Sequence, residues 1–145
     1  MDPLYLEPED FKKSFDLAPR VAINLFVVNK ANQFLLTKRT APPHAGEWHL
    51  PGSFVLKYET VDACIERLAA SELGFTVSAK DCYLKLVHDN IDADPRGHVI
   101  DIVYRYRVLR DIVLTSWGDS AEMGFFTTIP DGVGFNHAEI LKKLV

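Results

Sequence analysis

A single carboxylate, Glu72, continues the apolar stripe of a predicted helix. Val61, Ile65 and Leu68 recur at helical spacing, and Glu72 lies one further turn along the same face. Helical geometry therefore directs this side chain toward the core, near the helix end where the macrodipole disfavours negative charge. Burying a carboxylate without a partner costs on the order of several kcal/mol, so the position requires a cation.

Two interpretations of that cation follow from the residues. Glu72 either forms a salt bridge with Arg39 or Arg67, or binds a metal ion. The stripe alone favours the salt bridge, because most charged side chains on a helix are paired or solvated. The helix by itself does not decide between them.

The helix that carries Glu72 has clear start and stop signals. Its pattern extends from Thr60 to Leu73, with Thr60 as the expected N-cap and Asp62 in the first turn. Gly74 is the expected stop, because glycine readily adopts the left-handed conformation that ends helices.

The segment around this helix resembles the Nudix box of the Nudix hydrolases. That motif has a Gly, a Glu, an Arg followed directly by a Glu, a Glu-Glu pair, and a Gly followed by an apolar residue, all at fixed offsets. The box spans residues 53–75, and the lead-in Trp48 to Gly52 also resembles that family. The positions that match are Glu59, Arg67, Glu72, Gly74 and Phe75. Three positions depart from the motif: Ser53 replaces Gly, and Leu68 and Ser71 each replace a Glu.

Two branches of the family are visible along the chain. The first half, including residues 34–39 and 66–74, looks like the GDP-mannose mannosyl hydrolases. The later segments 94–100 and 134–141 look like the ADP-ribose pyrophosphatases. The resemblance implies one Nudix domain over residues 1–145, an α/β fold built as an α/β/α sandwich with a mixed central sheet and a loop-helix motif.

The resemblance also implies a Mg²⁺ cofactor, with Mn²⁺ as the alternative ion. Mg²⁺ keeps several waters and takes one or two protein carboxylates, so the Gly52 carbonyl and Glu72 form a sufficient set. Glu59 is either a further ligand or the salt-bridge partner of Arg67, and the salt bridge is favoured because the two positions suit orienting the loop against the helix.

Four residues are candidates for substrate binding. Arg39 matches a diphosphate-binding Arg of the GDP-mannose branch, although a surface Arg at a strand end is the simpler interpretation. Arg67 is either structural or reaches the sugar phosphate. Arg96 binds phosphate or fixes a turn with Asp94, and Trp48 stacks on a base or packs in the core.

The catalytic base is the least defined part of the site. The GDP-mannose branch has a His in the loop that corresponds to residues 117–122, whereas this chain offers Asp119 as a ligand and Glu122 as a general base. An exposed charged loop is the alternative for both. With Arg39 and Arg67, Glu122 completes the expected catalytic set. His88 and His98 are further candidates for acid–base catalysis or ribose contacts, although a lone His in a strand is more often structural.

Composition excludes several other classes of protein. The 145 residues have a net charge of −4, which argues against a general nucleic-acid binder, and 48% are hydrophobic, which is enough for a packed core. No apolar run approaches a membrane span and the acidic start lacks a signal pattern, so we expect a cytoplasmic protein. The two cysteines, Cys64 and Cys82, are expected to be free thiols, and relatives of this type suggest a homodimer.

The remaining elements follow from periodicity. A helix is expected from residues 7–17, a hairpin from 21–28 and 34–39, and short strands over 48–50, 54–56 and 124–127. Longer strands are expected over 82–87 and 98–108, polar loops over 89–97 and 115–123, and a closing helix over 136–144.

Three functions are consistent with these features. The first is a Mg²⁺-dependent hydrolase of a nucleotide sugar such as GDP-mannose. The second is hydrolysis of the diphosphate bond of ADP-ribose or a related compound. The third is a degenerate Nudix domain that binds a nucleotide without turnover, an option raised by Leu68 and Ser71.

Overall fold

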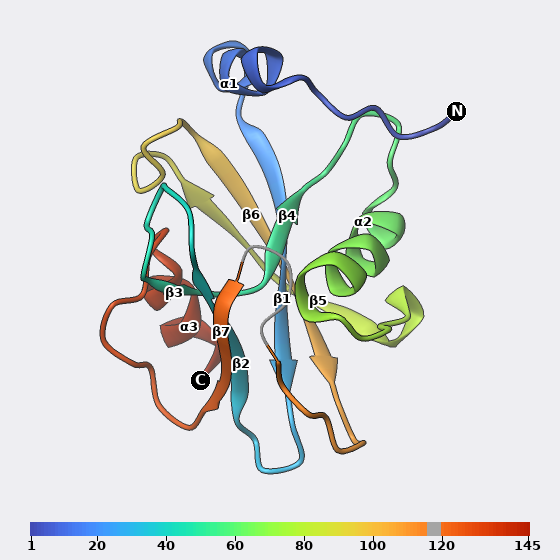
Figure 1. The fold of residues 1–145 in the computed structure, drawn as a ribbon, viewed down its shortest axis with the longest axis vertical. Helices are drawn as coiled ribbons and strands as arrows, with labels where there is room; N and C mark the ends of the chain where they lie inside the picture. The colour runs from blue at the N-terminus through green and yellow to red at the C-terminus, as the bar shows by residue number, and fades with distance from the viewer. Residues whose placement is uncertain (116–119) are drawn as a thin grey trace.

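A mixed sheet of seven strands forms the centre of the molecule (Figure 1). The computed structural model describes residues 1–115 and 120–145. The strand order is β3-β2-β1-β6-β5, with β4 paired to β1 and β7 paired to β2. The strands are β1 (Arg20–Val28), β2 (Phe34–Arg39), β3 (Trp48–His49), β4 (Gly52–Phe54), β5 (Cys82–Asn90), β6 (Val99–Arg107) and β7 (Ser120–Phe126).

Strand β1 is the central strand and pairs along its whole length. It runs parallel to β6 from Arg20 to Val28 and antiparallel to β2 and β4. Its residues are almost all buried, as expected for a strand covered on both faces. The predicted hairpin between β1 and β2 is confirmed by the pairing of Val28 with Phe34.

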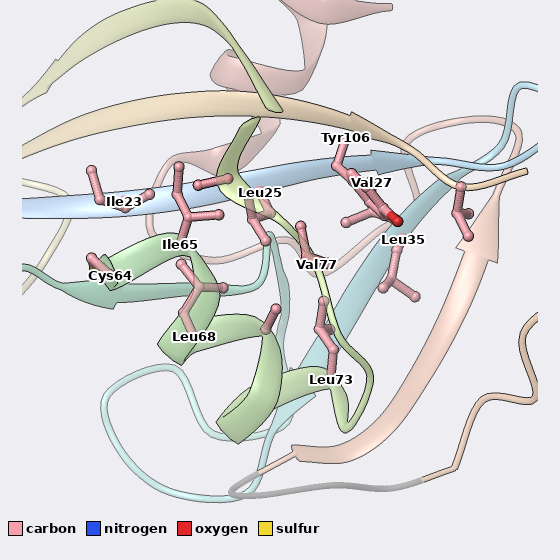
Figure 2. Packing of buried hydrophobic residues seen from close by; sticks show 13 residues of the cluster. Ile23, Leu25, Val27, Leu35, Cys64, Ile65, Leu68, Leu73, Val77 and Tyr106 are labelled. Carbon is pink, nitrogen blue, oxygen red and sulfur yellow. The ribbon is translucent and has the colours of Figure 1, made fainter. Parts of the chain in front are cut away.

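Helix α2 (Val61–Leu68) covers one face of the sheet. The Thr60 hydroxyl accepts a hydrogen bond from the Ala63 N–H at 3.1 Å, so the predicted N-cap is confirmed. The helix continues as one wider π turn, η1 (Ala69–Leu73), and ends at Gly74 with a positive φ of 71°. Figure 2 shows Ile65 and Leu68 packed against Ile23 and Leu25 of β1.

The opposite face of the sheet carries α1 (Pro8–Leu17) and α3 (His137–Leu144). Ile140 and Leu141 of α3 pack with alternate residues of β1 and β2. At the other end of this face, Phe11 and Phe15 pack edge-to-face on Phe54. Both faces of the sheet are therefore covered, and the predicted α/β/α arrangement is confirmed. A short 3-10 turn, η2 (Ala79–Asp81), leads into β5.

Three predicted boundaries differ from the structure. The loop expected over 115–123 ends earlier, because β7 begins at Ser120 and pairs with β2. Strand β5 continues through Asn90 rather than stopping at Val87, since Asp89 and Asn90 pair with β6. Strand β4 occupies Gly52–Phe54 instead of 54–56, because Gly52 pairs with Asn24. Across the described residues, no helix has both the length and the apolar character needed to cross a membrane.

Candidate functional site

A cavity of about 260 Å³ lies on the sheet face opposite α2. Ala22 and Asn24 of β1 line it, and they alternate with Ile23, which points into the core beneath α2. The other walls come from the ends of β2 and β3, from β4 and β6, from the loop after β5, and from the segment before α3. Residues far apart in sequence thus surround one space.

Gly52 forms part of the wall where β4 meets β1. A Cβ atom at this position would collide with the Asn24 side-chain oxygen and with the Ile23 carbonyl oxygen. The Leu25 N–H donates to the Pro51 carbonyl at 2.8 Å. Because successive carbonyls of an extended strand point to opposite sides, the Gly52 carbonyl is directed away from β1. That orientation leaves the Gly52 carbonyl suited to a ligand.

Arg39 stands at the end of β2 and lines the cavity. Its Nε donates to the Pro43 carbonyl at 2.7 Å, and its Nη2 donates to the Pro42 carbonyl at 3.3 Å. The guanidinium also lies over the Phe135 ring, 5.3 Å from its centroid. Arg39 is therefore a cavity cation fixed by the loop that follows β2, and not only a surface residue at a strand end.

Arg96 combines the two roles that the sequence left open. Its Nε and Nη2 donate to the two carboxylate oxygens of buried Asp94, at 3.0 and 2.8 Å, which fixes the turn. The same guanidinium lines the cavity and lies over the rings of Phe54 and Phe135, at 5.3 and 5.6 Å. The cavity wall is therefore an aromatic and cationic surface.

A buried polar pair forms another part of the lining. Asn24 Nδ2 donates to Asp101 Oδ1 at 2.7 Å across β1 and β6. Burial raises the pKa of Asp101 from 3.8 to about 6, and the charge of Asp94 adds to that rise, while the Asn24 and Asn90 amides oppose it. Neither Asn24 nor Asp101 was a predicted site residue, because their relation depends on the pairing of strands 77 residues apart.

Two buried histidines also line the cavity, and sequence reasoning missed them. The His137 Nδ1 accepts the Leu50 N–H at 3.0 Å, and the His49 Nδ1 donates to the Leu50 carbonyl at 2.7 Å. Burial lowers the pKa of His49 to about 4 and that of His137 to about 3, so both rings are neutral near pH 7. His88 and His98, the predicted candidates, do not line the cavity.

Glu59 is the salt-bridge partner of Arg67. Arg67 Nε and Nη2 donate to the two Glu59 oxygens at 2.6 and 2.9 Å, and the Glu59 side chain is only 2% exposed. Arg67 also donates to the Ser53 hydroxyl at 3.0 Å and to the Phe54 carbonyl at 2.9 Å. Arg67 therefore ties α2 to β4, which is the positioning role that the sequence favoured.

Glu72 lies half-buried in the π turn η1. Its carboxylate and the Gly52 carbonyl are both oxygen donors, and oxygen is the ligand atom that Mg²⁺ prefers. Among residues 1–115 and 120–145, no group of three or more His, Cys, Asp or Glu side chains is arranged to hold a metal. The donor chemistry thus fits only a sparse Mg²⁺ site, at which other oxygen ligands would have to complete the coordination.

Five of the predicted site residues do not line the cavity: Trp48, Glu59, Arg67, Glu72 and Glu122. Trp48 packs edge-to-face on Phe126, with Lys38 over its ring. Glu122 is 60% exposed and pairs with Lys38 at 3.3 Å. Lys38 shares the α3 side of β2 with Leu36, so Glu122 and the α2 helix occupy opposite faces. Asp119 lies outside the described residues.

Comparison with known proteins identifies relatives over almost the whole chain. The model of the NUDIX domain matches residues 18–129. An ADP-ribose pyrophosphatase from Methanocaldococcus jannaschii is 35% identical over 143 residues, which cover 94% of this chain and 80% of that protein.

Solved structures share the fold. A MutT NUDIX hydrolase from Burkholderia pseudomallei superimposes with a TM-score of 0.75 at 27% identity, covering 88% of this chain and 99% of that one. A MutT/nudix family protein from Enterococcus faecalis gives a TM-score of 0.75 at 18% identity, covering 97% of this chain and 73% of that one.

Proposed function

The chain belongs to the Nudix family of hydrolases, and on this basis we propose that it hydrolyses the diphosphate bond of ADP-ribose or a closely related nucleoside diphosphate derivative. The similarity to the Methanocaldococcus jannaschii ADP-ribose pyrophosphatase carries the proposal, since it extends over 94% of this chain. None of the relatives described above supports the GDP-mannose branch that the first half of the sequence suggested.

The cavity supports a nucleotide substrate. Its volume of about 260 Å³ is near the lower end of the roughly 300–1000 Å³ of small-molecule sites, so it suits one end of such a substrate. Phe54 and Phe135 offer stacking surfaces for a base. Arg39, held at the end of β2, offers the positive charge that a diphosphate requires.

We propose that Glu72 and the Gly52 carbonyl hold the Mg²⁺ ion. A bound divalent ion neutralises the diphosphate charge and stabilises the leaving group. Arg67 acts as a positioning residue, because its bonds to Glu59 and Phe54 fix the helix against β4. Arg39 binds and orients the phosphates, which carry the negative charge that develops in the reaction.

The experiment that tests this function is a product analysis with Mg²⁺. ADP-ribose, GDP-mannose, GDP-glucose and UDP-glucose are incubated separately, and the products are separated by ion-exchange chromatography. We expect AMP and ribose 5-phosphate from ADP-ribose. Release of a nucleoside diphosphate and a free sugar from GDP-mannose would overturn the proposal in favour of attack at the sugar carbon.

The proposed metal site is tested by Glu72→Gln, which keeps the shape of the side chain and removes its charge. We expect the variant to lose Mg²⁺-dependent turnover and to keep the wild-type circular dichroism spectrum. Asp62→Asn is the matched control, because it removes a carboxylate from the exposed first turn of the same helix. Equal turnover in Glu72→Gln and wild type would show that Glu72 does not hold the metal ion.

One observation favours a second function. In the part of the chain that the structure describes, metal-binding side chains do not cluster, and Leu68 and Ser71 occupy positions where the motif has Glu. A domain that binds ADP-ribose without hydrolysing it accounts for this sparse set. Calorimetric binding of ADP-ribose with no product after prolonged incubation with Mg²⁺ or Mn²⁺ would identify this function.

A further inference from the structure

Asp101 is a buried carboxylate with one oxygen left open. The residue lies within β6, is 2% exposed, and lines the cavity. Its Oδ1 accepts the Asn24 amide, but its Oδ2 makes no hydrogen bond with any described group. The Asn90 amide lies near enough to lower the pKa of Asp101, but it donates its hydrogen bond to the Phe135 carbonyl at 2.8 Å. Buried polar atoms are nearly always hydrogen-bonded in folded proteins, so an unpaired carboxylate oxygen in a residue that lines a cavity points to a ligand donor.

The charged groups around Asp101 do not fill this role. Arg96 donates from Nε and Nη2 to Asp94, and Arg39 donates to the carbonyls of the loop after β2. His137 Nε2 is 4.0 Å from Asp101 Oδ1, too far for a hydrogen bond. Since His137 Nδ1 accepts the Leu50 N–H, the single proton of the neutral ring is on Nε2. A neutral N–H group from a ligand is the donor that suits the open oxygen.

The walls beside Asp101 favour a flat ligand. Phe11, Phe54 and Phe135 line the same cavity, and the planar Arg96 guanidinium lies over all three rings. Such surfaces can stack on an aromatic base. Of the groups on a base, the exocyclic amine of adenine, guanine or cytosine is a neutral N–H donor at the edge of the ring.

We propose that Asp101 Oδ2 accepts a hydrogen bond from the exocyclic amino group of the substrate's nucleobase, which makes Asp101 a specificity-determining residue. The proposal rests on the proposed function for the nature of the ligand, a nucleoside diphosphate derivative. It does not depend on turnover, because it concerns binding of the base. The pKa of Asp101, about 6, leaves the carboxylate ionised and able to accept at neutral pH.

The first test uses the wild-type protein and two probes, AMP and purine-riboside 5′-monophosphate, which has hydrogen in place of the amino group. Isothermal titration calorimetry at pH 8 measures both dissociation constants. We expect AMP to bind at least about tenfold more tightly, since a site built for a hydrogen bond rejects ligands that cannot make it. Equal affinities, or no binding of either probe, would overturn the proposal.

The second test uses Asp101→Asn, which replaces the open oxygen or its neighbour by an amide group of the same shape. We expect the preference for AMP to fall to within about threefold of unity. Asp94→Asn is the matched control, because it also neutralises a buried carboxylate of the cavity. It is expected to weaken both probes through Arg96 and to keep their ratio. If Asp101→Asn kept the wild-type preference for AMP, another residue would have to recognise the amino group, and the proposal would be overturned.

The pH dependence of the preference provides an independent readout. The other titratable groups that line the cavity are Arg39, His49, Asp94, Arg96 and His137, and both histidines stay neutral at pH 5. Protonation of Asp101 below about pH 6 removes the acceptor. We therefore expect the preference for AMP to be smaller at pH 5 than at pH 8, and a constant ratio would contradict the role of Asp101. Absence of ADP-ribose hydrolysis would contradict the proposed function alone and leave these binding results to stand.

Discussion

Arg67 donates from Nε and Nη2 to both oxygens of Glu59, which lies across the turn that leads into α2. Two parallel hydrogen bonds of this kind fix both the distance between the guanidinium and the carboxylate and their relative orientation. The same guanidinium reaches the Phe54 carbonyl of β4, so one side chain connects the loop, the helix and the strand that forms the cavity wall. The geometry of the site therefore depends on this ion pair even though neither member lines the cavity.

Loss of this ion pair is expected to destabilise the protein. Glu59→Gln removes the charge from a side chain that is 2% exposed and leaves Arg67 without its partner. We expect the free energy of unfolding to fall by about 2 kcal/mol, measured by urea denaturation at pH 7. Glu139→Gln is the control, because it breaks the exposed pair with Lys142 and should have no measurable effect. Equal effects of the two variants would contradict the structural role of Glu59.

The hydrogen-bonding geometry of the Arg39 guanidinium, and not only its charge, is expected to matter for substrate binding. Arg39→Lys keeps the positive charge but cannot donate to the Pro42 and Pro43 carbonyls in the same way. We expect kcat/KM for ADP-ribose to fall at least about tenfold through a higher KM, or the dissociation constant to rise equally if turnover is absent. Arg107→Lys, at an exposed strand end, is the control and should behave as wild type. Unchanged kinetics in Arg39→Lys would exclude Arg39 from phosphate binding.

Acid is expected to destabilise the protein through its buried histidines. His49 and His137 are neutral when folded, so protons bind preferentially to the unfolded chain below about pH 6.5. Asp101 opposes this loss of stability between pH 6 and 4. Its pKa is raised in the folded protein, so over this interval the folded state binds a proton that the unfolded state does not. From these three groups the unfolded state binds a net excess of about one proton, so stability falls by about 1.4 kcal/mol per pH unit over that interval.

Asp101→Asn tests this balance, because Asp101 is the group among these three that opposes the loss of stability in acid. We expect its stability to fall about twice as steeply as that of wild type between pH 6 and 4, measured by urea denaturation at half-unit steps. Asp62→Asn, on the exposed first turn of α2, should keep the wild-type slope. A shallower slope in Asp101→Asn would contradict the raised pKa of Asp101.

Both thiols are expected to be unreactive in the native protein. Burial raises the pKa of Cys64 to about 12 and that of Cys82 to about 11, and the thiolate is the reactive form. We expect no fast reaction with a disulfide reagent such as DTNB at pH 8, and full reaction of both residues in urea. Rapid native labelling that disappears in Cys82→Ser would show that Cys82 is more accessible than the structure indicates.

Local patterns in the sequence were sufficient for the elements of the fold. The helix from Thr60 to Gly74 carries its own cap, stripe and stop, and each is confirmed. The boundaries of β5 and β7 were wrong where polar residues such as Asp89 lie within a strand. Such residues stay in a strand because their backbone groups form hydrogen bonds with the neighbouring strand. The sequence of a single segment does not show which strand it will pair with.

The sequence by itself determined the family and the Nudix box, because fixed offsets along one loop and one helix are local information. Only the tertiary structure decided the composition of the cavity. Asn24 and Asp101 meet because β1 and β6 pair in parallel, and His137 reaches Leu50 because α3 packs on the sheet. Such contacts depend on strand register, and the pKa of each group depends on how deeply it is buried. The spacing of residues along the chain encodes neither the register nor the burial.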